Sequence, residues 1–237
     1  MDRDWARRVW EILNSYFGPQ LNTFVVDYAA NNFELLVAII LSQNTTEKNA
    51  INAFQNLKSR VGLDPYKIYN TSIGEIEEKI RVAGLYRQKA RAIKALANSV
   101  VNGLDLDELL SLDVEKARRI LLGIKGIGKK TVDVFLAIHG KRIMGLDTHA
   151  IRIAQRWNIS SSASYDDIQN AYINLFGFVD NFDRLHKLLI LLGKNYCTAK
   201  KPRCYECPIS TLCPKKTYRT LKARLIFGML NMLWFFV

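Results

Sequence analysis

The sequence predicts an all-α protein. Apolar residues recur at helical spacing in one segment after another, and no segment shows the strict apolar–polar alternation that is typical of a half-buried strand. The chain has 237 residues, of which 49% are hydrophobic, so it can form one large folded domain or two modest ones. It contains neither internal repeats nor low-complexity segments.

The N-terminal half contains a close succession of expected helices. Residues 5–17 carry an apolar face at helical spacing, which the Gly-Pro pair at 18–19 ends. Residues 33–41 are apolar almost all round, which predicts a fully buried helix, with a buried strand as the alternative. Further helices are expected at residues 47–57, 73–82, 87–101, 107–112 and 114–122.

The expected helix at residues 87–101 has an apolar side and a basic side. The basic side consists of Arg87, Lys89, Arg91 and Lys94. We interpret it as a solvated face rather than a functional one, because charged side chains are mostly exposed.

The C-terminal half adds four expected helices and a loop that contains cysteines. The helices cover residues 131–138, 150–157, 165–176 and 185–192. Ser164, followed three residues later by Asp167, has the pattern of a helix N-terminal cap. Gly193 is expected to end the last helix.

The charge balance indicates a polyanionic partner. Lys and Arg total 34 against 22 acidic residues, a formal net charge of +12. Nucleic acid is the common partner of such a chain, and an anionic membrane surface is the competing interpretation. The first residues are polar and charged, without the apolar run of a signal peptide. We therefore expect a cytoplasmic, nucleoid-associated protein that is neither secreted nor transmembrane.

One glycine-rich stretch, residues 121–132, has the features of a phosphate-binding turn. Its glycines permit a tight turn, and the apolar run that follows begins a helix there. Backbone amides and the helix dipole favour an anion at such an N-terminus. The turn residues are Gly126, Ile127, Gly128, Lys129 and Lys130. The alternative is a plain helix–turn–helix with a solvated lysine pair.

All four cysteines lie within 17 residues: Cys197, Cys204, Cys207 and Cys213. Clustered thiols in a reducing compartment indicate metal rather than disulfides. Zinc and an iron–sulfur cluster are both compatible with four thiolates, and one compact loop with a single Cys-x-x-Cys pair fits a cubane better. Four unrelated thiols are the alternative. The first loop of this site is basic, with Lys200, Lys201 and Arg203.

Taken in order, these motifs resemble the endonuclease III branch of the helix–hairpin–helix DNA glycosylases. The resemblance rests on the hairpin at 126–131, the Leu-Asp-Thr-His run at 146–149 and the cysteine spacing, and it covers roughly residues 5–215. The sequence departs from the family at Lys125, where proline is frequent, and at Val132, where alanine is common.

The resemblance implies two α-helical domains with a DNA groove between them. The six-helix domain, residues 32–142, would carry the hairpin. The second domain, residues 1–31 plus 143–217, would hold a [4Fe–4S] cluster as cofactor on the four cysteines. Residues 218–237 form an apolar tail that matches nothing expected of the family.

The resemblance also implies a reaction and the residues that perform it. Oxidised pyrimidines would be excised from DNA, and the strand would then be cleaved by β-elimination through a lysine Schiff base. Lys130 would be the nucleophile and Asp147 the catalytic carboxylate. Leu85 would enter the DNA as a wedge, and either Gln43 or Asn44 would fill the place of the flipped base. The further expected DNA contacts are Gly126, Ile127, Gly128, Lys129, Lys200, Lys201 and Arg203.

The expected partner is double-stranded DNA with a damaged base or an abasic site. We expect a monomer that needs no small-molecule cosubstrate. One alternative is a monofunctional glycosylase for thymine or uracil opposite guanine, but such relatives often lack the nucleophilic lysine. The other is a non-catalytic helix–hairpin–helix DNA-binding module, which would need neither Lys130 nor Asp147.

Overall fold

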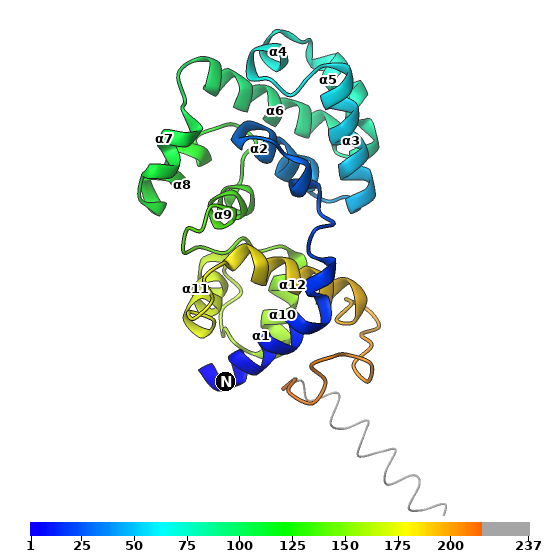
Figure 1. Ribbon diagram of the computed structural model, residues 1–237, viewed down its shortest axis with the longest axis vertical. Coiled ribbons are helices and arrows are strands. Elements are labelled where there is room, and N and C mark those ends of the chain that lie inside the picture. Colours follow the sequence, from blue (N-terminus) through cyan, green and yellow to red (C-terminus); the bar gives the residue numbers. More distant parts are fainter. Residues whose placement is uncertain (215–237) are drawn as a thin grey trace, which may run out of the picture. The chain divides into compact units, whose positions relative to one another are not determined.

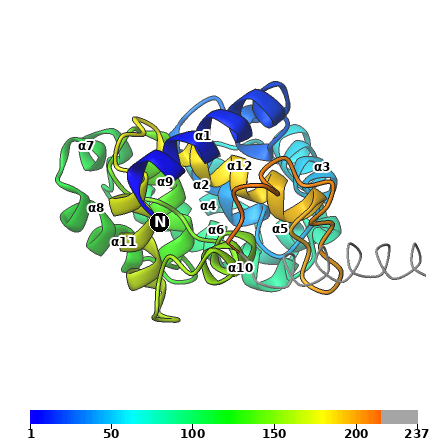
Figure 2. The same ribbon diagram turned by 90° about the horizontal axis from the view of Figure 1, so that it is seen from below.

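The computed structural model describes residues 1–214 as an entirely helical protein (Figures 1 and 2). Within these residues it contains twelve α-helices, three short 3-10 helices and no strand, which confirms the all-α prediction. No helix of the described residues is long and apolar enough to cross a membrane. The predicted apolar tail at 218–237 lies outside the described residues.

The chain divides into two compact units. The hairpin unit consists of Pro19–Gly145 and Val179–Arg184, and the cluster unit of Met1–Gly18, Leu146–Phe178 and the described chain from Leu185 onward. Residues 19–31 therefore pack with the hairpin unit. One reason is a hydrogen bond of 2.6 Å from the backbone amide of Val25 to Oε1 of Glu47.

The hairpin unit is built around α2 (Asn32–Leu41), whose residues from Phe33 to Leu41 are all buried, as the sequence predicts. The other helices are α3 (Glu47–Arg60), α4 (Pro65–Asn70), α5 (Ile73–Lys79), α6 (Tyr86–Val101), α7 (Leu106–Ser111), α8 (Val114–Leu122) and α9 (Lys129–Ile138), with the 3-10 helices η1 (Gly18–Gln20), η2 (Val25–Tyr28) and η3 (Arg81–Ala83). Helices α3, α6 and α9 pack against α2 (Figure 1). The one acidic residue of α2, Glu34, is buried and bonded to Lys58 at 2.8 Å. Burial of this apolar helix positions the loop that follows it.

The basic face of α6 is not simply solvated, contrary to our interpretation of the sequence. Lys89 is only 2% exposed. Lys94 donates to the backbone carbonyls of Ile68, Tyr69 and Thr71, and so caps the C-terminal end of α4. These lysines serve backbone carbonyls inside the unit because their long stems reach over the apolar side of the helix.

The cluster unit contains α1 (Arg3–Phe17), α10 (Thr148–Trp157), α11 (Tyr165–Leu175) and most of α12 (Phe182–Asn195). Its core is aromatic: the rings of Trp5 and Trp157 meet edge to face with centroids 5.2 Å apart, and Phe176 packs against both. The Ser164 side chain accepts a bond of 3.1 Å from the amide of Asp167, so the predicted cap is present.

Helix α12 does not end at Gly193, as the sequence suggested, but continues to Asn195. The glycine has a packing role instead. A Cβ atom at Gly193 would lie 2.4 Å from Nδ1 of His149, on α10, which is closer than any real contact. The absent side chain therefore allows α10 and α12 to approach each other.

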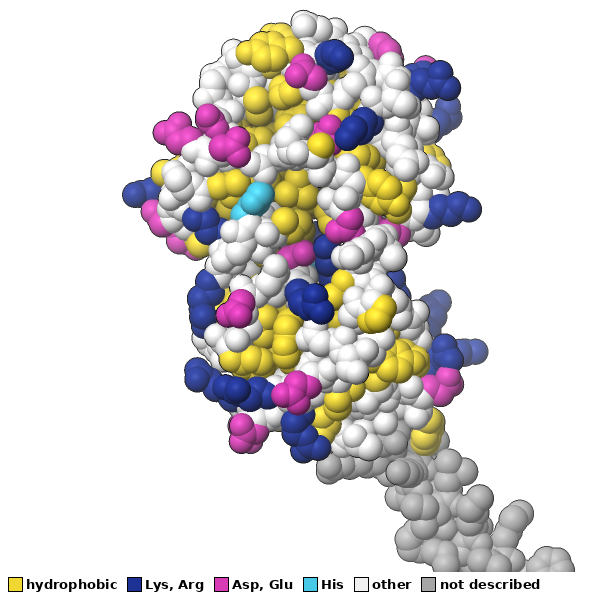
Figure 3. Space-filling view, viewed as in Figure 1, with side chains coloured by type: hydrophobic (Ala, Val, Ile, Leu, Met, Phe, Trp, Pro, Cys, Tyr) yellow, Lys and Arg dark blue, Asp and Glu magenta, His cyan; other side chains and the backbone are white. Residues whose placement is uncertain are grey.

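Basic side chains are spread over the surface of both units. Figure 3 shows Lys and Arg side chains, with Asp and Glu side chains between them, around apolar patches on the face that it draws. The excess of basic residues in the sequence, a formal net charge of +12, indicates a broad electrostatic attraction for a polyanion.

Candidate active site and iron–sulfur centre

The predicted phosphate-binding turn is a hairpin between α8 and α9. Gly126 has a φ of +90°, and a Cβ atom there would lie 2.8 Å from Cβ of Ala92 on α6. Only glycine satisfies both the left-handed backbone and this close approach. Ile127 is buried, and its amide donates to the carbonyl of Ile124 at 3.1 Å. The Ile127 amide thus closes the turn within the protein.

The outer side of the hairpin is the N-terminal end of α9. Gly128 is the N-cap, and Lys129 and Lys130 are the first two residues of the helix. The first backbone bond of the helix runs from Val132 to Gly128 at 3.2 Å, so the amides before Val132 belong to the open end of the helix. A Cβ atom at Gly128 would meet nothing within 4 Å. The end of α9 therefore has room for an anion, with two lysines beside it.

The loop after α2 separates Gln43 from Asn44. The Gln43 side chain donates from Nε2 to Oγ1 of Thr131 at 2.8 Å and is half-buried. Asn44 is exposed and has a φ of +48°, in the left-handed region. Gln43 thus supports α9 next to Lys130, whereas Asn44 is presented to the outside.

The predicted wedge, Leu85, projects from a turn before α6. It has a φ of +46° and is 48% exposed, and Gly84 before it has a φ of +66°. An exposed leucine on a left-handed backbone is costly on both counts. This geometry fits a side chain that is held out for a partner.

The buried amine of Lys89 lies near the N-terminal end of α9. Nζ of Lys89 donates to the carbonyl oxygens of Leu41 at 2.8 Å and Ala83 at 2.9 Å. Burial lowers the pKa of Lys89 from 10.5 to about 8, and the neighbouring charge of Lys130 acts in the same direction.

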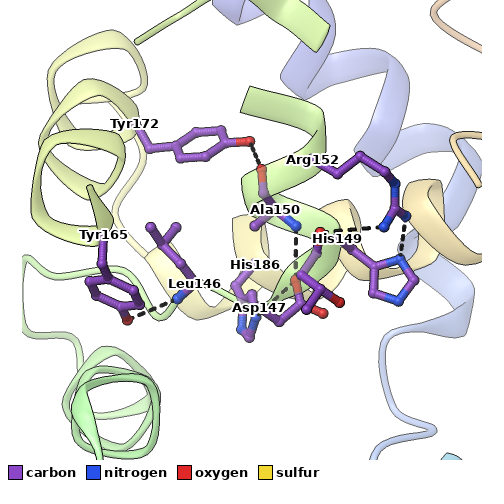
Figure 4. A network of polar contacts seen from close by, with 9 residues as sticks. Leu146, Asp147, His149, Ala150, Arg152, Tyr165, Tyr172 and His186 are labelled. Atoms are coloured by element: carbon purple, nitrogen blue, oxygen red, sulfur yellow. Dashed lines mark hydrogen bonds and ion pairs between the residues drawn. The ribbon is translucent and has the colours of Figure 1, made fainter. Parts of the chain in front are cut away.

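The cluster unit holds the predicted carboxylate, Asp147, at the N-cap of α10 (Figure 4). Its Oδ1 accepts from the amide of Ala150 at 2.8 Å and lies 4.0 Å from Nε2 of His186 on α12. The side chain of Asp147 is 15% exposed, and that of His186 4%. The cap thus fixes one carboxylate oxygen while part of the side chain remains accessible.

Two tyrosines of α11 hold the chain around Asp147. The backbone amide of Leu146 donates to the hydroxyl of Tyr165 at 3.1 Å, and the hydroxyl of Tyr172 donates to the carbonyl of Ala150 at 2.8 Å (Figure 4). Complete burial, followed by the charge of Asp147, raises the pKa of Tyr172 well above 10. Tyr172 therefore stays a neutral donor across the physiological range.

The same helix, α10, holds the first cysteine of the C-terminal loop. Arg152 donates from Nε to the carbonyl of Cys197 at 2.9 Å, and Arg156 donates from Nη1 to its Sγ at 3.0 Å. Arg156 also bonds the carbonyls of Thr198 and Ala199. Arg152 in addition contacts Nδ1 of His149 at 2.9 Å, and burial lowers the pKa of His149. One helix thus carries Asp147 at its start and the loop anchor at its end.

All four cysteines line one small pocket, together with Trp157, Tyr196 and Ile209. No three His, Cys, Asp or Glu side chains of the described residues converge closely enough for a single metal ion. Four cysteine thiolates around one pocket match the ligand set of an iron–sulfur cluster. Burial raises the pKa of Cys207 to about 12, and a bound cluster would supply the positive charge that keeps this ligand a thiolate.

The basic loop between the first two cysteines is on the surface. Lys200 and Lys201 are exposed. Arg203 is exposed as well, but it forms an ion pair with Glu206, and its guanidinium lies 5.5 Å from the ring centroid of Tyr196. Of the three predicted DNA contacts in this loop, the two lysines project most openly.

Several residues around these sites escaped prediction from the sequence. They are Lys89, Arg152, Arg156, Tyr165, Tyr172 and His186. Lys89 had a detectable signal, because it lies four residues before Ile93, on the apolar stripe of α6. The others act across helix–helix contacts, which the spacing within one helix does not reveal.

Comparison with known families agrees with the helix–hairpin–helix architecture. Residues 37–176 match the HhH-GPD superfamily of base excision DNA repair proteins, and residues 197–213 match the iron–sulfur binding domain of endonuclease III. The fold and its hairpin thus define a base excision DNA repair protein.

Individual relatives narrow this class. The chain is 39% identical to an endonuclease III of Sulfolobus acidocaldarius over 81% of this chain and 86% of the relative. It is 31% identical to that of Haemophilus influenzae, over 78% and 84%. A solved structure of a trapped endonuclease III–DNA covalent intermediate superimposes with a TM-score of 0.75 at 23% identity, covering 93% of this chain and 99% of the other.

The chain belongs to the endonuclease III family, the iron–sulfur-containing DNA glycosylases with AP lyase activity that act in base excision repair. The iron–sulfur cofactor predicted from the four cysteines is confirmed as well.

Proposed function

We propose that this protein excises oxidised pyrimidines from double-stranded DNA and cleaves the strand through Lys130. The observation that carries the assignment is the position of Lys130 at the second residue of α9. The positive end of the helix dipole favours a neutral, nucleophilic amine at this point.

The chemistry follows from an amine at that position. Nζ of Lys130 attacks C1′ of the flipped nucleotide, the bond from C1′ to the base breaks, and the base leaves with a proton. The amine loses its proton and the sugar ring opens, which gives an imine between Nζ and C1′. The imine acidifies a proton on C2′, whose removal expels the 3′ phosphate and cleaves the strand.

Asp147 supplies the carboxylate for this reaction. It takes up the proton that the Lys130 amine releases, or stabilises positive charge as it develops on the sugar. Its cap bond to Ala150 and the tyrosine contacts around it hold the carboxylate in one orientation.

The N-terminal end of α9 binds a DNA phosphate, and two side chains enter the duplex. Because the Ile127 amide is used within the turn, the phosphate contact falls to the amides from Gly128 onward. Leu85 and Asn44 enter the duplex, and Gln43 supports α9 instead. Lys200 and Lys201 contact phosphates from the cluster loop.

The roles of the two units and the oligomeric state follow from the same proposed function. The hairpin unit corresponds to the six-helix domain of the family and the cluster unit to its iron–sulfur domain. The protein acts as a monomer on duplex DNA that contains a damaged base or an abasic site.

Borohydride reduction tests the central step. With a duplex that carries one thymine glycol, the wild-type protein should give a covalent protein–DNA adduct, because the reductant converts the imine to a stable amine. Lys130→Ala should abolish the adduct and the strand cleavage but keep DNA binding, since the helix-end contacts belong to the backbone. Asp147→Asn should keep binding and lower the excision rate by about 10².

Lys129→Ala is the matched control, because it removes the adjacent amine from the same helix end. It should still give the adduct. Trapping by Lys130→Ala but not by Lys129→Ala would move the nucleophile by one residue. A wild-type protein that excises bases without ever forming an adduct would refute the lyase assignment.

A further inference from the structure

Lys89 connects two segments that are distant in sequence. Its Nζ donates to the carbonyl of Leu41, the last residue of α2, and to that of Ala83, the last residue of η3. The residue is only 2% exposed, so water does not compete for these bonds. One buried ammonium group therefore ties the end of α2 to the end of η3.

Each of these two carbonyls stands directly before a loop with a left-handed residue. Asn44 follows Leu41 by three residues with a φ of +48°, and Leu85 follows Ala83 by two with a φ of +46°. Within the described residues, only Asn158 is a third non-glycine with a positive φ. Such conformations are unfavourable for residues that have a Cβ atom, and they persist where the surroundings impose them.

We propose that Lys89 is a positioning residue that holds the Asn44 loop and the Leu85 turn in one fixed arrangement, so that both side chains enter the DNA together. This inference rests on the proposed function, in which Asn44 and Leu85 are the entering residues.

A lysine suits this task better than an apolar residue of the same length. Methionine would fill the space without burying a charge, but it would leave both carbonyls without their donor. The lysine retains a charged donor at a desolvation cost, which is visible in the lowering of its pKa to about 8. Bonds from a charged donor are shorter and stronger than neutral ones, so they restrict the loops more tightly.

The test compares Lys89→Met with Lys94→Met. Lys94 lies on the same helix and also donates to backbone carbonyls, but those carbonyls belong to the end of α4. Each variant is assayed on a duplex with one thymine glycol and on a duplex with a pre-formed abasic site, under single-turnover conditions with enzyme in excess. A 2-aminopurine next to the lesion reports unstacking by its fluorescence, and thermal unfolding reports stability.

Lys89→Met should slow thymine-glycol excision about 10-fold or more, because a displacement of about 1 Å of the entering side chains is sufficient for such an effect. The 2-aminopurine signal should fall in parallel, while cleavage at the abasic site changes much less, since little stacking opposes its extrusion. Lys94→Met should keep wild-type excision. Adding Leu85→Ala to Lys89→Met should slow excision less than the product of the two single effects, because both act on the same insertion step.

Wild-type excision and fluorescence in Lys89→Met would overturn the proposal, as would equal reductions in the Lys89 and Lys94 variants at equal stability. If Lys89→Met does not fold, Lys89→Gln keeps a shorter donor and should show the same pattern more weakly; wild-type kinetics in that variant would also overturn it. Failure of the proposed function is distinguishable, because the wild-type protein would then neither excise thymine glycol nor form the borohydride adduct.

Discussion

At the scale of single residues, the neighbours Gln43 and Asn44 have opposite surroundings. Gln43 is bonded to Thr131 at 2.8 Å, and Asn44 is exposed on a left-handed backbone. We therefore expect Asn44→Gly, which tolerates the positive φ, to slow lesion excision about 10-fold without a change in stability, because it removes only the side chain that enters the DNA. Single-turnover excision and thermal unfolding measure the two effects.

Gln43→Ala is the companion variant. It removes a partly buried hydrogen bond beside α9, so it should lower the free energy of unfolding by about 1 kcal/mol. Its effect on excision should be smaller than that of Asn44→Gly. The reverse ranking in excision would assign the entering side chain to Gln43.

The sequence identified these candidates but could not choose between them. Whether a residue adopts a positive φ depends on how its loop is held, and here Lys89 of another helix bonds the carbonyl of Leu41, three residues before Asn44. Lys89 itself looked like one of four basic residues on a solvated face. The role of a lysine on an apolar stripe can be inferred only when the carbonyls that accept its hydrogen bonds are known. For Lys89 these carbonyls lie 48 and 6 residues away in the chain.

At the scale of elements, the α8–α9 hairpin uses two glycines for different purposes. Gly126 combines a φ of +90° with a 2.8 Å approach to Ala92, whereas Gly128 has an extended backbone and open space around it. Gly126→Ala should therefore lower the free energy of unfolding by about 1–3 kcal/mol. Gly128→Ala should lower it less, by about 0.5–1 kcal/mol, because alanine is a poorer N-cap than glycine.

For DNA binding we expect the opposite order, with the larger effect at Gly128. A methyl group at Gly128 occupies the space by which a phosphate approaches the helix end, so Gly128→Ala should weaken binding to an abasic-analogue duplex several-fold. Denaturant titration measures the free energy of unfolding of the two variants, and a binding isotherm measures their affinity for the duplex. Unchanged binding by Gly128→Ala would show that the phosphate is bound elsewhere.

Most elements were predictable, because each carries its own apolar periodicity and end signals. The buried α2 and the cap at Ser164 agree with the sequence prediction. Two elements differ from the sequence analysis. Helix α12 continues through Gly193, where the absent side chain makes room for His149, and α4, which was not among the expected helices, is capped by Lys94 of another helix.

At the scale of the whole molecule, the iron–sulfur loop is held by α1 and α10, two helices that are distant from each other in the sequence. The indole of Trp5 on α1 donates to the carbonyl of Leu212 at 2.8 Å, and Arg152 and Arg156 of α10 bond Cys197. The loop returns onto α1 and α10 of the cluster unit (Figures 1 and 2). The cluster therefore closes a unit whose segments come from distant parts of the sequence.

Removal of iron should consequently destabilise the cluster unit first. Without the cluster, the four cysteines lose the metal-binding free energy that holds the loop in place. Helix α10, which has Asp147 at its N-cap, then loses the loop that is bonded to its other end. After oxidative removal and chelation of the iron, we expect a thermal midpoint lowered by several degrees.

Limited trypsin digestion of the iron-free protein should cut first at Lys200, Lys201 or Arg203, while a fragment containing residues 19–145 resists longer. Lesion excision should fall together with DNA binding, and the salt dependence of binding should weaken by about one unit of slope for each phosphate that the loop no longer neutralises. An iron-free protein with the wild-type thermal midpoint and an uncut loop would show that the cluster does not hold this unit together.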